Sequence, residues 1–252
     1  MFLFLDEFLG GFYMYKRVLL KLSGEALKEQ SGMQIIDVEN LGKMASAIKS
    51  INDQGVEVCV VTGAGNIWRG KLAKDIGIEA VPADYMGMLG TVINAVAMAS
   101  SLKNMGVDAV VYSAIPEING VTSAYNVDEA NKALKAGKVA FLAGGTGKPF
   151  YTTDTAATLR AIELNCEAIL MGKNGVKGVY SADPTKNADA KFFSSITFDE
   201  MLKLNLQIMD ASALELIKDK DIEIRVFSMS EAENFVKVAQ GQDIGTVCKK
   251  GE

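Results

Sequence analysis

The 252-residue sequence contains no histidine and has only three cysteines, four prolines and one tryptophan. Without histidine, the chain cannot form a Ser-His-Asp or Cys-His catalytic arrangement. Cys59, Cys166 and Cys248 are too far apart to build a common zinc pattern, and such sparse cysteine is typical of a reducing cytoplasm. Any chemistry must therefore use Lys, Arg, Asp, backbone amides or a bound metal ion.

The sequence also lacks a strong excess of positive charge. Its net charge is −5, with 23% charged and 49% hydrophobic residues, which is ordinary for a soluble globular protein. This balance gives no broad attraction to nucleic acid or to an anionic membrane, although it is compatible with a local basic cleft. We therefore expect a cytoplasmic protein with neither partner.

Residues 1–14 are apolar but lack the basic start of a targeting signal. Asp6 and Glu7 interrupt them, and they are too short to span a bilayer. We interpret them as an N-terminal extension outside the fold, with a weak interfacial anchor as the alternative. Residues 15–252 are expected to form one domain.

Short apolar runs rich in Val and Ile recur along the chain and are continuous rather than alternating. Such runs are typical of strands that are buried on both faces of a sheet. They occupy residues 17–23, 56–63, 108–114, 138–144, 167–172 and 222–229.

Segments with helical spacing separate these runs. Residues 37–54, for example, place Leu41, Met44, Ala45, Ile48 and Ile51 on one helical face. Gly55, Gly106 and Gly137 each stand where a helix would end before the next strand. The alternation predicts the α/β class, a single-domain α/β/α sandwich with a mainly parallel central sheet, in which ligands bind at the carboxyl ends of the strands.

The first two predicted strands end in residues suited to phosphate. Lys21 precedes the small step Ser23-Gly24, and Gly65 is followed four residues later by Arg69. Glycine lets the backbone approach an anion, and arginine offers a planar pair of donors. The alternative for Lys21 is a side chain that snorkels from the strand to solvent. Trp68 is expected to pack rather than to stack on a base.

The fourth predicted strand ends in AGGTGKPFYTTDTAA, residues 143–157. In the register of a P-loop, Leu142 replaces the first glycine and Pro149 replaces the hydroxyl residue, so this is not a standard ATP loop. A plain glycine-rich turn is the alternative. The threonines and Asp154 precede a helical pattern, where free amides favour anions, and helix capping is the alternative role for Asp154.

The fifth predicted strand ends in a glycine-punctuated loop, residues 171–184. Asn174 and Tyr180 are suited to holding an adenine, with Asp183 at a proline turn. By itself this segment could equally be a hairpin. Loops suited to phosphate at several strand ends nevertheless favour a nucleotide site.

These motifs resemble the bacterial uridylate kinase branch of the amino acid kinase superfamily from about Tyr15 to the C-terminus. The motifs, in order, are KLSGEAL, GAGNIWRG, DYMGMLGTVINA, SAIPEING, GGTGKPFYTTDTAA, GVYSADP and IMDASA. The resemblance implies phosphorylation of UMP by ATP with Mg²⁺, giving UDP and ADP, in a homohexamer. It makes UTP a candidate inhibitor. Activation by GTP is not expected, because residues 32–37 depart from the family's usual run.

The resemblance also assigns site residues. The catalytic residues would be Lys21, Arg69, Asp154 and Asp210, with no protein side chain assigned to a metal. The ATP site would contain Lys21, Leu22, Ser23, Gly24, Gly65, Arg69, Asn174, Tyr180 and Asp183. The UMP site would contain Ala64, where the family often has glycine, and Asp84, Thr146, Gly147, Lys148, Pro149, Phe150, Tyr151, Thr152 and Thr153.

Two other functions remain open on the sequence. One is a kinase of the same superfamily that acts on a carboxylate or a carbamate. The other is a protein that stores a nucleotide or an oxyanion without catalysis. The joint presence of Lys21, Arg69 and Asp154 favours turnover.

Overall fold

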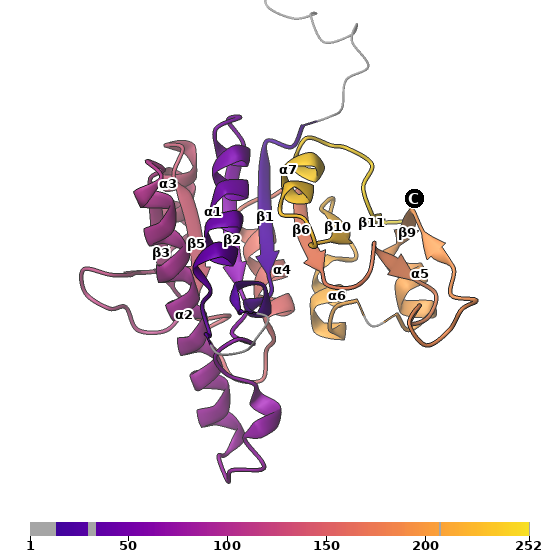
Figure 1. The fold of residues 1–252 in the computed structure, drawn as a ribbon, viewed down its shortest axis with the longest axis horizontal. Helices are drawn as coiled ribbons and strands as arrows, with labels where there is room; N and C mark the ends of the chain where they lie inside the picture. The colour runs from indigo at the N-terminus through magenta and orange to yellow at the C-terminus, as the bar shows by residue number, and fades with distance from the viewer. Residues whose placement is uncertain (1–13, 30–33, 207, 252) are drawn as a thin grey trace, which may run out of the picture.

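The computed structural model describes residues 14–29, 34–206 and 208–251. Its centre is a nine-stranded sheet with strand order β4-β3-β5-β2-β1-β6-β10-β11-β9 (Figure 1). All neighbouring strands are parallel except β10 and β11. The predicted mainly parallel α/β sheet is therefore confirmed.

The six predicted strands all form, with ends within one residue of the expected ones. They are β1 (Arg17–Leu22), β2 (Glu57–Thr62), β3 (Ala109–Ser113), β5 (Val139–Ala143), β6 (Ala168–Lys173) and β10 (Glu223–Ser228). Three shorter strands, which the sequence did not reveal, complete the sheet edges. They are β4 (Ser123–Ala124), β9 (Ser195–Thr197) and β11 (Thr246–Lys249).

Helices cover both faces of the sheet (Figure 1). One face carries α1 (Val38–Asn52), α2 (Ala80–Asn104) and α7 (Glu233–Ala239), and the other carries α3 (Val127–Lys135), α4 (Thr153–Glu163), α5 (Phe198–Lys203) and α6 (Ala211–Ile217). Strand side chains alternate between two cores, so Leu20 packs on the first face and Leu19 on the second. Burial on both faces explains the continuous apolar runs.

The predicted helix ends are also confirmed. Asp37 caps α1 by accepting a hydrogen bond from the backbone N–H of Asn40. Gly55, Gly106 and Gly137 have φ angles of 84°, 79° and 77°, the left-handed region in which glycine avoids a Cβ clash. Each lets the chain leave a helix and enter the next strand.

Helix α2 is long and apolar enough to span a bilayer by length and composition alone, but half of its most apolar window is buried in the fold. It packs against β3, β5 and α1. Its N-terminal half extends past the carboxyl ends of the strands (Figure 1). This core helix therefore forms one wall beside the strand ends.

The described chain begins at Met14, so residues 1–13 of the expected extension lie outside the described residues, and the extension remains a prediction. Tyr15 is buried, and its hydroxyl donates to Glu223 and accepts from Arg225. The run 32–37, on which the expectation about GTP depends, is described only from Gln34 onward.

Candidate active site

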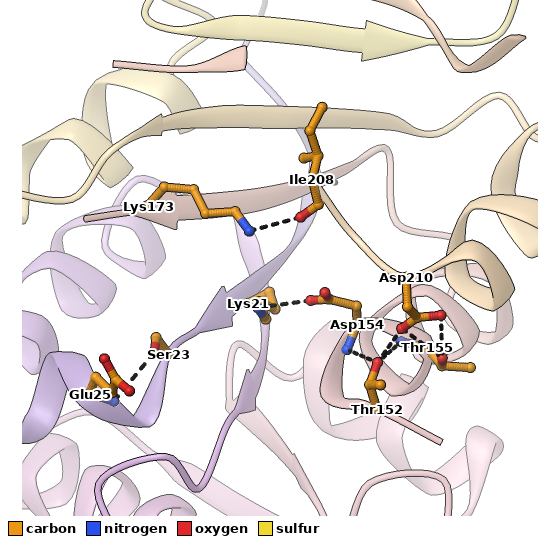
Figure 2. Close-up of polar contacts among 9 residues, drawn as sticks. All are labelled: Lys21, Ser23, Glu25, Thr152, Asp154, Thr155, Lys173, Ile208 and Asp210. Carbon is orange, nitrogen blue, oxygen red and sulfur yellow. Dashed lines mark hydrogen bonds and ion pairs between the residues drawn. The ribbon is translucent and has the colours of Figure 1, made fainter. Parts of the chain in front are cut away.

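Lys21 lies at the carboxyl end of β1, in the middle of the sheet. Its ammonium lies 2.8 Å from Asp154 Oδ1, and the two side chains are 15% and 18% exposed (Figure 2). A snorkelling lysine would extend to solvent instead, so that alternative is wrong. The pair joins the carboxyl end of β1 to the start of α4, the helix that follows the glycine-rich loop after β5.

Asp154 is not the cap of α4. The cap is Thr152, whose Oγ1 accepts from the backbone N–H groups of Asp154 and Thr155. The carboxylate of Asp154 is thereby left to face Lys21. Its buried Oδ1 accepts no well-directed hydrogen bond from the described residues, so the contact with Lys21 is chiefly electrostatic.

Asp210 lies beside this pair but forms hydrogen bonds rather than an ion pair. It caps α6, accepting from the N–H of Ala213, and it also accepts from the hydroxyls of Thr152 and Thr155 (Figure 2). Asp210 therefore fixes the first turn of α4, which carries Asp154. Its predicted effect on the lysine is indirect in this arrangement.

The loops that follow β1 and β2, which the sequence predicts for ATP phosphates, pack tightly against each other. A Cβ at Gly24 would lie 2.6 Å from the carbonyl oxygen of Gly63 and 2.4 Å from Asn66 Oδ1, so no other residue fits there without movement. Ser23 caps the short helix η1 (Gly24–Leu27) by accepting from Glu25 N. Glycine at this point brings backbone N–H groups close to any bound phosphate.

Arg69 follows these loops and forms an ion pair with Glu25 at 2.5 Å, with side chains 59% and 45% exposed. Its Nε also donates to the Gly65 carbonyl. Glu25 was not singled out in the sequence, because an acidic residue in a phosphate-suited motif gives no obvious signal. Its carboxylate occupies the guanidinium that the sequence predicts for phosphate.

A buried amide pair supports the donor loop and was also missed. Asn66 and Asn94 exchange hydrogen bonds of 3.0 and 2.8 Å, and Asn94 also donates to the Gly63 carbonyl. The residues are 6% and 0% exposed. Because Asn94 lies on α2, this helix holds the loop after β2 in place.

A cavity of about 270 Å³ opens at the start of α4, between α2 and the loops after β2 and β5. Asp84 Oδ2 accepts a hydrogen bond of 2.6 Å from Phe150 N, which ties α2 to the loop after β5. Thr146 to Phe150 lie along that loop and do not line the cavity. The lining residues are Ala64, Gly65, Trp68, Gly70, Ala83, Asp84, Gly87, Met88, Thr91, Gly145, Tyr151, Thr152 and Thr153.

Trp68 is held in one orientation within this lining. Its Nε1 donates to the carbonyl of Ala83 on α2 at 2.8 Å. This anchoring agrees with the packing role expected from the sequence. The indole links the loop after β2 to the cavity wall.

The loop after β6 contains a hairpin, formed by β7 (Val179–Tyr180) and β8 (Phe192–Phe193). The rings of Tyr180 and Phe192 meet edge to face at 5.4 Å. Asp183 is exposed, and hydrogen bonds from Thr185 lower the pKa of its carboxyl. The hairpin interpretation is thus correct, while the roles of Asn174, Tyr180 and Asp183 toward adenosine remain predictions.

Lys173, at the end of β6, was not predicted as a site residue. Its ammonium donates to the carbonyl of Ile208 at 2.8 Å (Figure 2). Burial lowers its pKa below the usual value for lysine, the charge of Lys21 lowers it further, and the charge of Asp154 opposes both. The available signal was a lysine directly after the predicted strand at 167–172.

A second hollow, of about 370 Å³, lies at the opposite ends of the strands. Its lining includes the carboxylates of Glu167, Asp221 and Glu223 beside Arg225. Three acidic groups against one cation disfavour phosphate. The residues suited to nucleotides therefore concentrate at the carboxyl ends of β1, β2, β5 and β6.

Comparison with known proteins agrees with this arrangement. The profile of the amino acid kinase family matches residues 16–228. A uridylate kinase of Mycoplasma capricolum is 47% identical over 236 residues, covering 93% of this chain and 98% of its own length.

Two solved structures are similar along nearly the whole chain. The UMP kinase of Bacillus anthracis superposes with a TM-score of 0.91 at 38% identity, covering 95% of this chain and 98% of that one. The UMP kinase of Ureaplasma parvum gives 0.88 at 37% identity, covering 93% and 99%. The chain belongs to the amino acid kinase family, within its uridylate kinase branch.

Proposed function

We propose that the chain transfers the γ-phosphoryl group of ATP to UMP, giving UDP and ADP in pyrimidine nucleotide biosynthesis. The observation that carries this proposal is the Lys21 and Asp154 pair, which lies between the glycine loops after β1 and β2 and the loop after β5. A cation at that position would lie between the phosphoryl donor ATP and the phosphoryl acceptor UMP. The relatives named above are kinases of the same acceptor.

The chemistry fits a site without histidine. A phosphate oxygen of UMP is already anionic near neutral pH, so its attack on phosphorus needs no general base, and the difficulty is to bring two anions together. Lys21 offsets charge on the transferring group, Arg69 and the glycine amides hold the donor phosphates in line, and Asp154 orients Lys21.

The two nucleotides are assigned to the two sides of this pair. ATP binds along residues 21–24, Gly65 and Arg69, with its adenosine toward Asn174, Tyr180 and Asp183. UMP binds in the 270 Å³ cavity, against Ala64, Asp84 and residues 151–153 of its lining. Residues 146–150 lie outside the lining, and their predicted contact with UMP requires that the loop after β5 reach the nucleotide beyond the cavity. Asp210 supports the site through the first turn of α4.

Magnesium fits this site as part of the ATP complex. The described residues contain no cluster of three or more potential ligand side chains for a metal ion. Mg²⁺ in nucleotide sites is held mainly by phosphates and water, with one or two carboxylates. Asp154, which faces Lys21, is the carboxylate that would help to hold the ion, and the ion would neutralise charge on the transferring group.

An ADP-release assay with competing acceptors tests this function. UMP, CMP, aspartate, acetylglutamate and carbamate are each supplied with MgATP, with and without GTP or UTP. We expect ADP release that depends on UMP. Release with an acid or carbamate instead would support the related kinases, and tight ATP binding without ADP release would support storage.

We further propose a cytoplasmic homohexamer. The exposed side of α2 carries a row of apolar side chains that a single chain leaves uncovered. Contiguous exposed apolar surface of this kind marks protein interfaces. The row consists of Val81, Tyr85, Met86, Leu89 and Ile93, between 37% and 51% exposed.

A further inference from the structure

A second lysine, Lys173, lies near Lys21 at the carboxyl ends of neighbouring strands. In the register of β1 and β6, Lys21 pairs with Met171, and Lys173 lies two residues further along β6. Paired residues of parallel strands and residues two apart on one strand share a face of the sheet. Lys173 therefore emerges on the face of Lys21, toward α4 and Asp154.

The surroundings of Lys173 balance its charge only in part, because Asp154 acts on it without forming an ion pair with it. It is partly buried, and its partner is the neutral carbonyl of Ile208. No ion pair within the described ranges includes Lys173, whereas Lys21 contacts Asp154. Burying an ammonium without a counter-ion is costly. This arrangement is expected where a ligand supplies the missing negative charge.

The nearby carboxylates are already engaged. Asp154 faces Lys21, and Asp210 accepts from Thr152, Thr155 and Ala213. Two ammonium groups thus share one facing carboxylate. The surplus positive charge lies at the strand ends, where the reacting phosphates are expected under the proposed function.

We propose that Lys173 is a further catalytic residue, whose ammonium contacts the γ-phosphate of ATP opposite Lys21 and stays with it during transfer. The proposal rests on the proposed function. The bond from the γ-phosphorus to the bridging oxygen of ADP breaks while a bond to a UMP phosphate oxygen forms. Lys173 remains protonated throughout and stabilises charge on the transferring oxygens.

A structural role must be separated from this one. Lys173 also holds the carbonyl of Ile208, two residues before the cap of α6. If that hydrogen bond were its whole function, replacing Lys173 would lower thermal stability and weaken ATP and ADP binding equally. A contact with the γ-phosphate instead affects ATP alone.

The experiment compares Lys173→Met and Lys173→Arg with Lys177→Met, a matched control at an exposed lysine of the same loop. Calorimetry without acceptor measures the binding of MgATP and MgADP. Steady-state assays with UMP give kcat and KM, and thermal unfolding reports stability. Because the binding measurement needs no acceptor, it tests Lys173 even if UMP proves to be the wrong substrate.

For Lys173→Met we expect ATP affinity to fall about tenfold or more, ADP affinity to stay within about twofold, and kcat to fall about a hundredfold. Lys173→Arg should recover part of both losses, and Lys177→Met should match the parent protein. Equal losses for ATP and ADP, or a kcat for Lys173→Met within about threefold of the parent, would overturn the proposal. A parent protein that binds ATP but releases no ADP with UMP contradicts only the proposed function.

The pH dependence gives an independent readout. The charged groups that act on Lys173 are Lys21 on β1 and Asp154 at the start of α4, and burial together with Lys21 places its pKa below the usual lysine value. Its ammonium is therefore lost at lower pH than that of an exposed lysine. The kcat/KM for ATP should fall on the alkaline side, and in Lys173→Arg, whose guanidinium stays charged, this fall should move to higher pH. An unchanged alkaline limb would count against the contact.

Discussion

Lys21 and Asp154 show how a charge pair at a strand end differs from an ordinary surface ion pair. Both side chains are mostly withdrawn from water, so their interaction is screened less than that of an exposed pair. The carboxylate also keeps the lysine aimed across the gap between β1 and α4. Under the proposed function, the pair holds this cation in place for the transferring group before a nucleotide binds.

Replacing Lys21 with alanine tests this preparation. We expect Lys21→Ala to lower kcat by about 10²–10³-fold, because the charge that stabilises the transferring group is lost. Circular dichroism should show that the fold survives. Lys16→Ala, at an exposed lysine before the same strand, is the control and should keep normal turnover. Near-normal kcat in Lys21→Ala would refute the assigned role.

Glu25 is expected to restrain Arg69 in the free protein. Both side chains are substantially exposed, so the ion pair contributes at most about 0.2–1 kcal/mol. Glu25→Gln should therefore tighten ATP binding by up to about fivefold, measured by calorimetry. Glu39→Gln breaks a similarly exposed pair with Lys43 on α1 and should leave ATP affinity unchanged. Weaker ATP binding in Glu25→Gln would mean that Glu25 orients Arg69 instead.

At the scale of elements, α2 connects the two halves of the site. Its Asn94 holds the loop after β2 through Asn66 and Gly63, while its Asp84 holds the loop after β5 through Phe150. Thr91 on the same helix accepts from Gly144 N. One helix thus sets the spacing between the loop after β2 and the loop after β5.

The loop after β5 depends on close backbone packing at Gly147. Its φ is 78°, and an added Cβ would lie 2.5 Å from the carbonyl oxygen of Ala114. Gly147→Ala should raise the KM for UMP about tenfold or more while the KM for ATP changes little, because the acceptor loop must shift.

Gly137→Ala is the control for this substitution. Gly137 has nearly the same φ, 77°, but nothing lies within 4 Å of an added Cβ. Gly137→Ala should lower the free energy of unfolding, measured in urea, by about 1–2 kcal/mol because of left-handed strain alone. Both KM values should stay unchanged. Equal KM values for UMP in the two variants would show that the contact with Ala114 does not position the loop.

At the scale of the whole molecule, the sheet brings together four loops that follow the carboxyl ends of its strands. β1 lies between β2 and β6, and β5 follows β2, so the ends of these four neighbouring strands meet. The first, second, fourth and fifth predicted strands of the chain therefore contribute to one site. The third, β3, is displaced outward beyond β5 and contributes none of the predicted site residues.

The apolar row on α2 predicts an assembly. Replacing Leu89 and Ile93, which are 51% and 49% exposed one helical turn apart, with lysine should place two charges in the proposed contact. Light scattering should show a hexamer for the parent chain and a smaller species for the double variant. Leu216→Lys, at a partly exposed leucine on α6, should keep the parent mass. An unchanged mass in the double variant would exclude this face as the interface.

The sequence by itself determined the six longer strands, the alternation of strands and helices, and the loops that carry phosphate-suited residues. These features depend on interactions between residues near in the chain, such as continuous apolar runs, the cap at Asp37 and the glycine that ends each of three helices. The glycine-rich motifs also identified the family correctly. The individual site roles remain predictions.

Only the tertiary structure decided the strand order and the partners of the site residues. Glu25 and Arg69 are 44 residues apart, and Asn66 and Asn94 are 28 apart, so no local pattern could pair them. Lys173 lies within electrostatic range of Lys21 and Asp154 only because β6 lies next to β1. Such contacts depend on how the sheet and helices pack to bury their apolar faces, which brings distant residues together.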